Sequence, residues 1–219
     1  LFLKSQQMKN HYHIQSSEAY TEACREAETS PDTFWDSIAR ENFEWMKPWD
    51  TVLEHDLSIP KVTWFKGAKL NITVNCIDRH LATRGSKTAL LFEPNEPTEP
   101  FLPISYQELH TRVCKMANVL KSKGIQKGDR VCLYLPMIPE LAIAVLACAR
   151  IGAVHSVVFA GFSSTALATR INDCDCKMVI TSDGSYRGAK TIDLKGIVDV
   201  ALIDCKGVTT VLVVQRIAS

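Results

Sequence analysis

The sequence lacks an excess of charge of either sign, and it lacks any long apolar run. Twenty-five lysines and arginines offset 24 aspartates and glutamates, which leaves a formal net charge of +1 over 219 residues. This balance provides no general field to attract a nucleic acid or an anionic membrane surface, so neither is expected as a partner. The longest apolar stretches, 141–149 and 153–160, are far shorter than the ~20 residues that span a bilayer, so no membrane crossing is predicted.

Several short motifs of known chemistry are also absent. Neither common nucleotide loop, Gly-x-Gly-x-x-Gly or Gly-x4-Gly-Lys-Ser/Thr, occurs in the chain. The chain has no His-Glu-x-x-His, no Gly-x-Ser-x-Gly and no Cys-x-x-Cys, so the zinc-protease, hydrolase and zinc-ribbon classes lose their usual support. Cys174-x-Cys176 is too isolated to form a metal site, and none is predicted. The eight cysteines favour reduced, mostly buried thiols and a cytoplasmic location.

The composition is otherwise that of an ordinary globular protein. Hydrophobic residues make up 46% and charged residues 22%, which disfavours disorder, collagen and coiled coil. All four tryptophans lie at or before Trp64, and all nine prolines lie at or before Pro139. From residue 86 onward, apolar runs of strand length alternate with amphipathic stretches of helix length. We therefore predict a doubly wound, mostly parallel α/β domain over 86–219, preceded by an aromatic-rich arm over 1–85.

The α/β part is predicted to contain five strands and four helices. The strands are expected at 88–92, 130–135, 153–160, 177–181 and 209–214, and the helices at 105–123, 139–150, 163–174 and 194–203. Ser105 and Glu108 have capping-box spacing, and Ser163 is the expected N-cap of the third helix. The segment 182–190 is expected to be a polar turn. Because a strand seldom ends an open sheet and the chain opens on Leu1, we expect a fragment.

Residues 1–70 are predicted to contain one helix, capped by Ser30 and opened by Pro31. The rest of this arm is expected to be extended chain whose aromatic side chains pack onto the sheet domain, with a separate aromatic ligand cage as the alternative. Asp78-Arg79-His80 looks like a catalytic cluster, but adjacent residues of a helix point in different directions. We interpret it as part of an amphipathic helix and, like His110 and His155, as a set of structural polar groups.

The positions of two turns make them candidate ligand-binding sites, because ligands of open parallel sheets bind beyond the carboxyl ends of the strands. The first is the turn at 159–163. Its Gly161 would let a ligand approach the backbone, and the helix that follows could offer free N–H groups to an anion or an amide. An ordinary strand-to-helix turn with Ser163 as its cap needs the same residues and remains the alternative.

The second turn lies within 183–190, where Arg187 and Lys190 flank the small residues Gly188 and Ala189. Two cations three residues apart can be directed at one phosphate, Arg187 through its planar fork and Lys190 as a compact charge. The small residues between them keep the surface open. A solvated basic loop is the alternative interpretation of the same residues.

Five segments of the chain, taken together, resemble those of one known protein family. They are WFKGAKLN at 64–71, NCIDRHL at 75–81, LPMIPE at 135–140, ARIGAVHSVVF at 149–159 and GFS at 161–163. Together they resemble the AMP-forming acetyl-CoA synthetases of the adenylate-forming enzyme superfamily, and the resemblance covers most of residues 30–205. Three positions depart from the family, which usually has glycine where this chain has Ala68, Ala160 and Ala189. The added methyl groups are strained only where the backbone φ is positive.

The resemblance implies a two-step ligase that makes acetyl-AMP and pyrophosphate from acetate and ATP, with Mg²⁺ accompanying the ATP, and then transfers the acetyl group to coenzyme A. It implies that Arg187, Gly188, Ala189 and Lys190 contact coenzyme A and that Gly161 lies beside its pantetheine arm. The family's ATP loop, acetate pocket and adenylation lysine would follow Ser219. No catalytic residue is therefore expected in these residues, which we expect to be inactive without the remainder of their own chain.

Two other functions stay open from the sequence. Within the same class, the protein could be a propionate–CoA or other short-chain acyl–CoA ligase, since acid selectivity depends on a pocket expected outside these residues. From a different class, it could be a non-catalytic module that binds coenzyme A. The cofactors and partners implied for the ligase are small molecules, namely ATP or AMP with Mg²⁺, acetate and coenzyme A.

Overall fold

The computed structural model describes residues 14–56 and 58–217. The chain divides into two compact units, of which the first ends at Leu70 and the second begins at Asn71. The domain boundary expected between residues 85 and 86 stays a prediction. None of the helices in these two described ranges is long and apolar enough to cross a membrane.

The first unit contains two consecutive helices, α2 (Ser17–Thr29) and α3 (Pro31–Asn42). Helix α3 is confirmed, with Pro31 in its first turn, but the Ser30 side chain makes no capping hydrogen bond. Ser30 also ends α2, where its N–H donates to the Glu26 carbonyl, and its φ of −142° with ψ of 58° departs from the extended geometry of most N-caps. Helix α2 was not predicted, because its apolar positions are mostly small alanines and give a weak stripe; in the structure it buries no residue.

The aromatic side chains of the first unit pack against one another. Strands β1 (Thr51–Asp56) and β2 (Lys61–Lys66) form an antiparallel hairpin. The buried Trp49 ring lies with its centroid 5.0 Å from that of Trp45 and 4.9 Å from that of Phe65. Aromatic pairs at such separations add to the free energy gained by burial alone. Packing of the arm onto the sheet domain, and the alternative of a ligand cage, stay predictions.

The second unit is organised around a four-stranded parallel sheet. Its strands run in the order β10-β7-β5-β6, with β5 at Arg130–Tyr134, β6 at Val154–Val157, β7 at Met178–Ser182 and β10 at Thr210–Val214. The central strand β7 is buried throughout, and β5 is buried except at Arg130. Burial on both faces explains why these strands read as continuous apolar runs.

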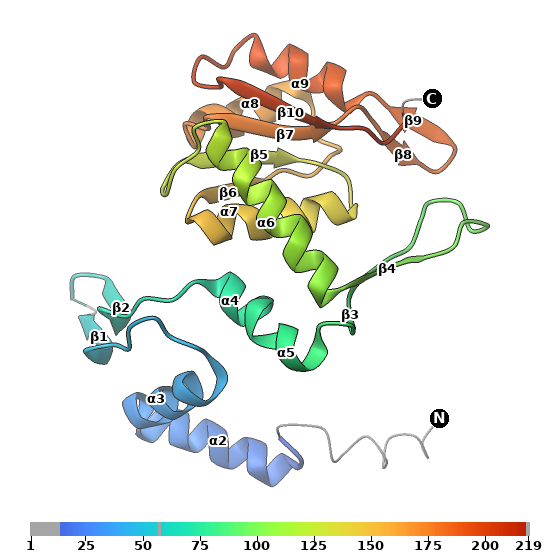
Figure 1. The fold of residues 1–219 in the computed structure, drawn as a ribbon. Coiled ribbons are helices and arrows are strands. Elements are labelled where there is room, and N and C mark those ends of the chain that lie inside the picture. The colour runs from blue at the N-terminus through green and yellow to red at the C-terminus, as the bar shows by residue number, and fades with distance from the viewer. Residues whose placement is uncertain (1–13, 57, 218–219) are drawn as a thin grey trace. The chain divides into compact units, whose positions relative to one another are not determined.

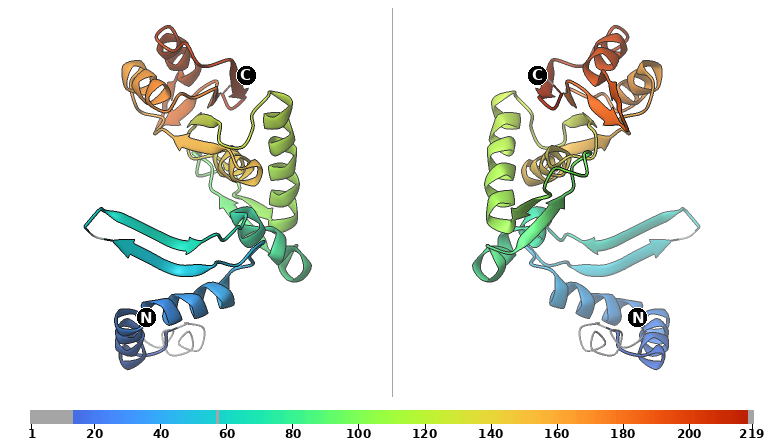
Figure 2. Two further views of the ribbon diagram at one scale, coloured as in Figure 1. Left: turned by 90° about the vertical axis from the view of Figure 1, so that its left-hand side faces the viewer. Right: turned by 90° about the vertical axis from the view of Figure 1, so that its right-hand side faces the viewer.

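Helices cover both faces of this sheet. Helices α6 (Tyr106–Ser122) and α7 (Pro139–Ile151) lie against one face, and α8 (Ser164–Asp173) and α9 (Leu194–Leu202) lie against the other. Figure 1 shows these two layers, and Figure 2 shows the green helix α6 across the sheet from the orange and red helices α8 and α9. The predicted doubly wound α/β fold is confirmed, as are these four helices.

The central strands divide their side chains between two cores. Val131 and Leu133 of β5 join the core beneath α6 and α7, whereas Cys132 and Tyr134 join the core beneath α8 and α9. This alternation follows from the two-residue period of a strand. Three of the eight cysteines, Cys132, Cys148 and Cys176, are buried, so the prediction of mostly buried thiols holds for only part of the set. Burial raises the pKa of Cys132 and Cys148 to about 12.

Two segments outside this sheet differ from the prediction. Strand β3 (Thr88–Phe92) has the expected bounds, but it pairs antiparallel with β4 (Leu102–Ser105) in a separate sheet, so the parallel sheet has four strands rather than five. The connection at 93–101 is too short for a parallel crossover. The expected polar turn at 182–190 instead contains a hairpin of β8 (Ser185–Arg187) and β9 (Lys190–Ile192).

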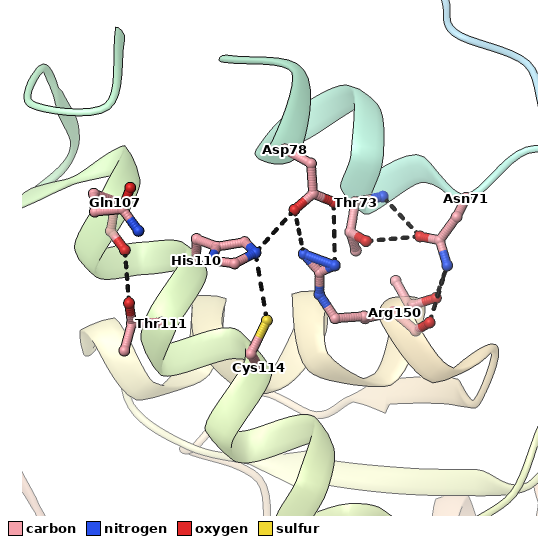
Figure 3. Close-up of polar contacts among 9 residues, drawn as sticks. Asn71, Thr73, Asp78, Gln107, His110, Thr111, Cys114 and Arg150 are labelled. Carbon is pink, nitrogen blue, oxygen red and sulfur yellow. Dashed lines mark hydrogen bonds and ion pairs between the residues drawn. The ribbon is translucent and has the colours of Figure 1, made fainter. Parts of the chain in front are cut away.

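Asp78 connects the segment that contains it to the helices α6 and α7. The amphipathic helix predicted around it is broken into α4 (Ile72–Cys76), the 3-10 turn η2 (Asp78–His80) and α5 (Leu81–Arg84). The Asp78 carboxylate accepts two hydrogen bonds from Arg150 on α7, at 2.6 and 3.1 Å, and lies 3.1 Å from Nε2 of His110 on α6. Figure 3 shows both side chains directed at this carboxylate. The structural interpretation of Asp78 and His110 is consistent with this arrangement.

Replacing Asp78 with Asn preserves the shape of the side chain but removes the charge opposite Arg150, whose side chain is only 20% exposed. We expect the free energy of unfolding to fall by roughly 1–3 kcal/mol, since a largely buried guanidinium loses its counter-ion. Denaturant unfolding measures the change. Asp199→Asn is the matched control, because Asp199 pairs with Lys195 on the exposed side of α9 and should cost less than ~1 kcal/mol. Equal losses in both variants would contradict the expectation.

Candidate functional site

The loops that follow all four parallel strands meet around one cleft of about 340 Å³, here called the strand-end cleft. Pro136 and Met137 follow β5, Phe159, Ala160 and Gly161 follow β6, the β8–β9 hairpin follows β7, and Arg216 follows β10. Phe92, Glu93 and Asn95, which come at or after the end of β3, complete the lining. This is the edge of an open α/β sheet at which ligands bind.

The strand-end cleft brings together two of the five predicted site residues. Gly161 and Arg187 both line it, although they are far apart in the sequence. Gly188, Ala189 and Lys190 belong to the same hairpin as Arg187 but do not line the cleft. Sequence position relative to the strand ends was therefore enough to predict that Gly161 and Arg187 lie at the same edge of the sheet.

The hairpin turn explains the order of its small residues. Arg187 and Lys190 are paired across the hairpin, so Gly188 and Ala189 form a two-residue loop. Gly188 has a φ of +59°, whereas Ala189 lies outside the left-handed region. A positive φ at the first loop residue alone is typical of a type II′ turn, which favours glycine there and accepts other residues at the second position. Ala189 therefore fits without strain.

The other two alanines that depart from the family pattern are also free of left-handed backbone. Phe65 and Asp175 are the residues other than glycine with positive φ in the described ranges, so neither Ala68 nor Ala160 is strained in this way. The methyl groups that these departures add impose no cost of backbone conformation.

Arg187 and Lys190 form a pair of like charges. They are exposed and directly opposite one another in the hairpin, and no described carboxylate forms an ion pair with either of them. Opposite positions place both side chains on one face of a hairpin, where like charges repel and destabilise the pairing. An anion bound between the two side chains would remove that repulsion.

The turn that contains Gly161 is fixed by one hydrogen bond to the sheet and one to the helix that follows it. The Tyr134 hydroxyl donates to the Phe162 carbonyl at 2.8 Å, and the Ser163 hydroxyl accepts from the Ala166 N–H at 3.3 Å. The second bond confirms Ser163 as the N-cap of α8. Burial raises the pKa of Tyr134, which keeps its hydroxyl a neutral donor. The strand-to-helix geometry that positions Gly161 is thus fixed by the buried Tyr134 on one side and the exposed Ser163 cap on the other.

Sequence reasoning did not find Tyr186 or Arg216, which also line the cleft. The guanidinium of Arg216 lies 5.5 Å from the Tyr186 ring centroid and 5.9 Å from that of Phe92. The available signal was positional, since Arg216 follows the end of β10 just as Arg187 follows β7. It was missed because a single arginine near a chain end carries no motif.

The cleft combines an apolar wall with a cationic side. Pro136, Met137, Phe159 and Ala160 supply apolar surface, and Arg187 and Arg216 supply positive charge against one carboxylate, Glu93. Such a lining suits an elongated ligand with an uncharged arm and an anionic end. Among the described residues, no three His, Cys, Asp or Glu side chains gather in a way that could hold a metal ion.

An open parallel sheet with helices on both faces and a cleft at its strand ends defines a doubly wound α/β protein, a class whose ligands bind at this edge. Residues 77–218 match the model of the AMP-binding enzyme family, and residues 20–76 match that of the acetyl-coenzyme A synthetase N-terminus. The chain therefore belongs to the AMP-binding enzymes and carries the N-terminal region of the acetyl-coenzyme A synthetase type. Both matches confirm the resemblance inferred from the sequence.

Curated relatives and a solved structure agree with this assignment. Acetyl-coenzyme A synthetase 2 of Pseudomonas putida is 53% identical over 199 residues, which cover 91% of this chain and 31% of that protein. Acetyl-coenzyme A synthetase of Saccharophagus degradans is 51% identical over 204 residues, 93% of this chain and 31% of that protein. The structure of acetoacetyl-CoA synthetase from Streptomyces lividans is similar over 97% of this chain and 32% of its own, with a TM-score of 0.85 and 26% identity. The chain thus spans about a third of these relatives.

Gly188→Ala places a side chain at the left-handed loop position of the hairpin. A Cβ there meets no heavy atom within 4 Å, so any loss of stability comes from backbone conformation alone. We expect the free energy of unfolding to fall by about 1 kcal/mol. Gly188→Asn, which tolerates positive φ better, should cost less. Thermal and denaturant unfolding compare the two variants, and a Gly188→Ala variant as stable as the wild type would contradict a positive φ at this position.

Proposed function

We propose that this chain is part of a cytoplasmic, AMP-forming acetate–CoA ligase. The full reaction converts ATP, acetate and coenzyme A into acetyl-CoA, AMP and diphosphate by way of acetyl-AMP. The observation that carries the proposal is the pair of adjoining family matches, an acetyl-coenzyme A synthetase N-terminus followed by an AMP-binding enzyme. Identity of about half to relatives named acetyl-coenzyme A synthetase supports acetate as the acid.

Within that reaction, we assign the strand-end cleft to coenzyme A. Arg187, which lines the cleft, and Lys190, which lies opposite it in the hairpin but outside the cleft lining, would hold a phosphate of its nucleotide between them, and the hairpin turn of Gly188 and Ala189 would fix their spacing. The apolar wall next to Gly161 would accept the uncharged pantetheine arm. The chemistry of the ligand, an anionic end on a long neutral arm, matches the two sides of this cleft.

We assign the ATP and acetate sites, and the groups that catalyse adenylation, to regions of the enzyme outside these residues. The relatives are about three times longer than the part that this chain matches. Mg²⁺ would arrive with ATP as part of the nucleotide substrate.

Two alternative functions remain to be distinguished from an acetate–CoA ligase by experiment. The similar solved structure is that of an acetoacetyl-CoA synthetase, which indicates that this fold also serves a different acid, so a propionate–CoA or other short-chain acyl–CoA ligase is the nearest alternative. The lower identity to that structure, 26% against 53% for the Pseudomonas putida enzyme, favours acetate. A non-catalytic coenzyme A-binding module is the alternative of another class.

The activity is tested with purified full-length protein and a series of short carboxylic acids. We expect acetate-dependent release of pyrophosphate from ATP, and acetyl-CoA formation when coenzyme A is added, with propionate and longer acids turned over less efficiently. Residues 1–219 alone are expected to show neither activity. A preference for propionate would replace the acid in the proposal, and coenzyme A binding without any acid-dependent pyrophosphate release would favour the non-catalytic module.

Arg187→Ala in the full-length protein tests the assignment of the cleft. Loss of charge-assisted phosphate contacts worth ~1.5–3 kcal/mol should weaken coenzyme A binding by about ten- to a hundredfold. Acetate-dependent exchange of pyrophosphate into ATP should be unchanged, because adenylation precedes coenzyme A binding. Calorimetric titration and the exchange assay measure the two effects. Arg112→Ala on α6, where Arg112 pairs with Glu108, is the control for lost surface charge. Lost exchange with intact coenzyme A binding would show the assignment to be wrong.

A further inference from the structure

Arg216 occupies a fixed position at the edge of the strand-end cleft. Its backbone N–H donates to Oδ1 of Asp183 at 2.8 Å, and the next N–H, that of Ile217, lies 3.1 Å from both oxygens of the same carboxylate. Oδ1 of Asp183 also accepts from the N–H of Gly184 at 2.8 Å, where the chain enters the hairpin that bears Arg187. One carboxylate therefore holds both segments that bring a cation to the cleft.

The side chain of Arg216 is held by aromatic rings rather than by an acid. Its guanidinium carbon lies 5.5 Å from the Tyr186 ring centroid and 5.9 Å from that of Phe92, distances at which a cation is attracted to the ring face. No carboxylate in the described parts of the chain forms an ion pair with it. Its buried Nε also lacks a hydrogen-bond partner among those residues. The rings orient the charge without neutralising it.

Two other arginines of the same unit show what a structural role looks like. Arg130 donates to the carbonyl oxygens of Cys174 and Asp175, at 2.6 and 3.1 Å. Arg150 forms its two-bond ion pair with Asp78. Each of these guanidinium groups donates at least two hydrogen bonds to the protein, although the buried Nε of Arg150, like that of Arg216, has no partner among the described residues. The side chain of Arg216 donates no hydrogen bond to a described residue, although a guanidinium has five N–H donors to offer.

The surrounding charges indicate on which side of Arg216 an anion would bind. Arg216 also lines a neighbouring cleft of about 290 Å³, where it faces Glu96 and Glu99. Two carboxylates against one cation disfavour an anion there. In the strand-end cleft, two arginines face the single carboxylate of Glu93, so that side favours an anion.

We propose that Arg216 is a second anion-binding residue of the strand-end cleft and contacts a phosphate group of the ligand together with Arg187. The inference rests on the proposed function, in which that ligand is coenzyme A. It adds a contact from the segment after β10 to the contacts expected from the hairpin. Arg216 thereby serves coenzyme A binding and has no part in adenylation.

The test measures binding of three probes to full-length protein by calorimetric titration. The probes are coenzyme A, dephospho-coenzyme A, which lacks the 3′-phosphate, and pantetheine, which has no phosphate. Arg216→Gln should weaken coenzyme A binding about tenfold or more and leave pantetheine binding unchanged. If dephospho-coenzyme A is weakened as much as coenzyme A, the contact is to the diphosphate; if it is unaffected, the contact is to the 3′-phosphate. Either result supports the proposal.

Two further variants keep the outcome decisive. Arg216→Lys retains the charge but loses the planar fork, so its coenzyme A affinity should fall between those of the wild type and Arg216→Gln; it also serves if the glutamine variant does not fold. Arg112→Gln on α6 controls for the lost charge and should bind all three probes normally.

The inference and the proposed function fail in different ways. Absence of coenzyme A binding by the wild type would overturn the proposed function. Coenzyme A binding that is weakened by Arg187→Ala but unchanged in both Arg216 variants would overturn the role of Arg216 alone. An equal loss of coenzyme A and pantetheine affinity in Arg216→Gln would also overturn it, because that pattern indicates a structural role.

Discussion

Burial of β5 and β7 on both faces is the constraint from which the rest of the second unit follows. A strand that is apolar on both faces needs a helix layer on each side, and parallel strands can be joined only by crossovers. The helices α6 and α7 on one face and α8 and α9 on the other meet that need. Because every crossover leaves a strand at its carboxyl end, the irregular loops gather at a single edge. The strand-end cleft is a product of this arrangement.

Local charge then gives the cleft its chemistry. The chain as a whole is almost neutral, so an anionic ligand gains little from long-range attraction. Arg187 and Arg216 provide positive charge in the cleft, where the loops after β7 and β10 bring them, and Lys190 lies opposite Arg187 in the hairpin, outside the cleft lining. Each is held by the backbone around it, and no described carboxylate pairs with any of the three. A site of this kind binds through contact and geometry.

The α/β layers could be predicted from the sequence because their signals are local and periodic. The capping serine Ser105, for example, accepts its predicted bond from the Glu108 N–H. What could not be predicted depends on contacts between distant residues. The Asp78 carboxylate meets Arg150 and His110 only after three helical segments have packed. The bounds of strand β3 were likewise predicted correctly, but its pairing with β4 was not, because the sequence pattern of a strand does not indicate which strand it pairs with. Arg216 reaches the cleft for the same tertiary reason.

The two-residue turn of the β8–β9 hairpin has a consequence for how this region can vary. Because Arg187 and Lys190 are adjacent to the loop on paired strands, their separation depends on the number of residues between them and hardly on what those residues are. A second-position alanine in place of glycine is accommodated, whereas one inserted residue would shift the register and turn the following side chains to the opposite face. The loop is permissive at its second position, favours glycine at its first, and is strict in length.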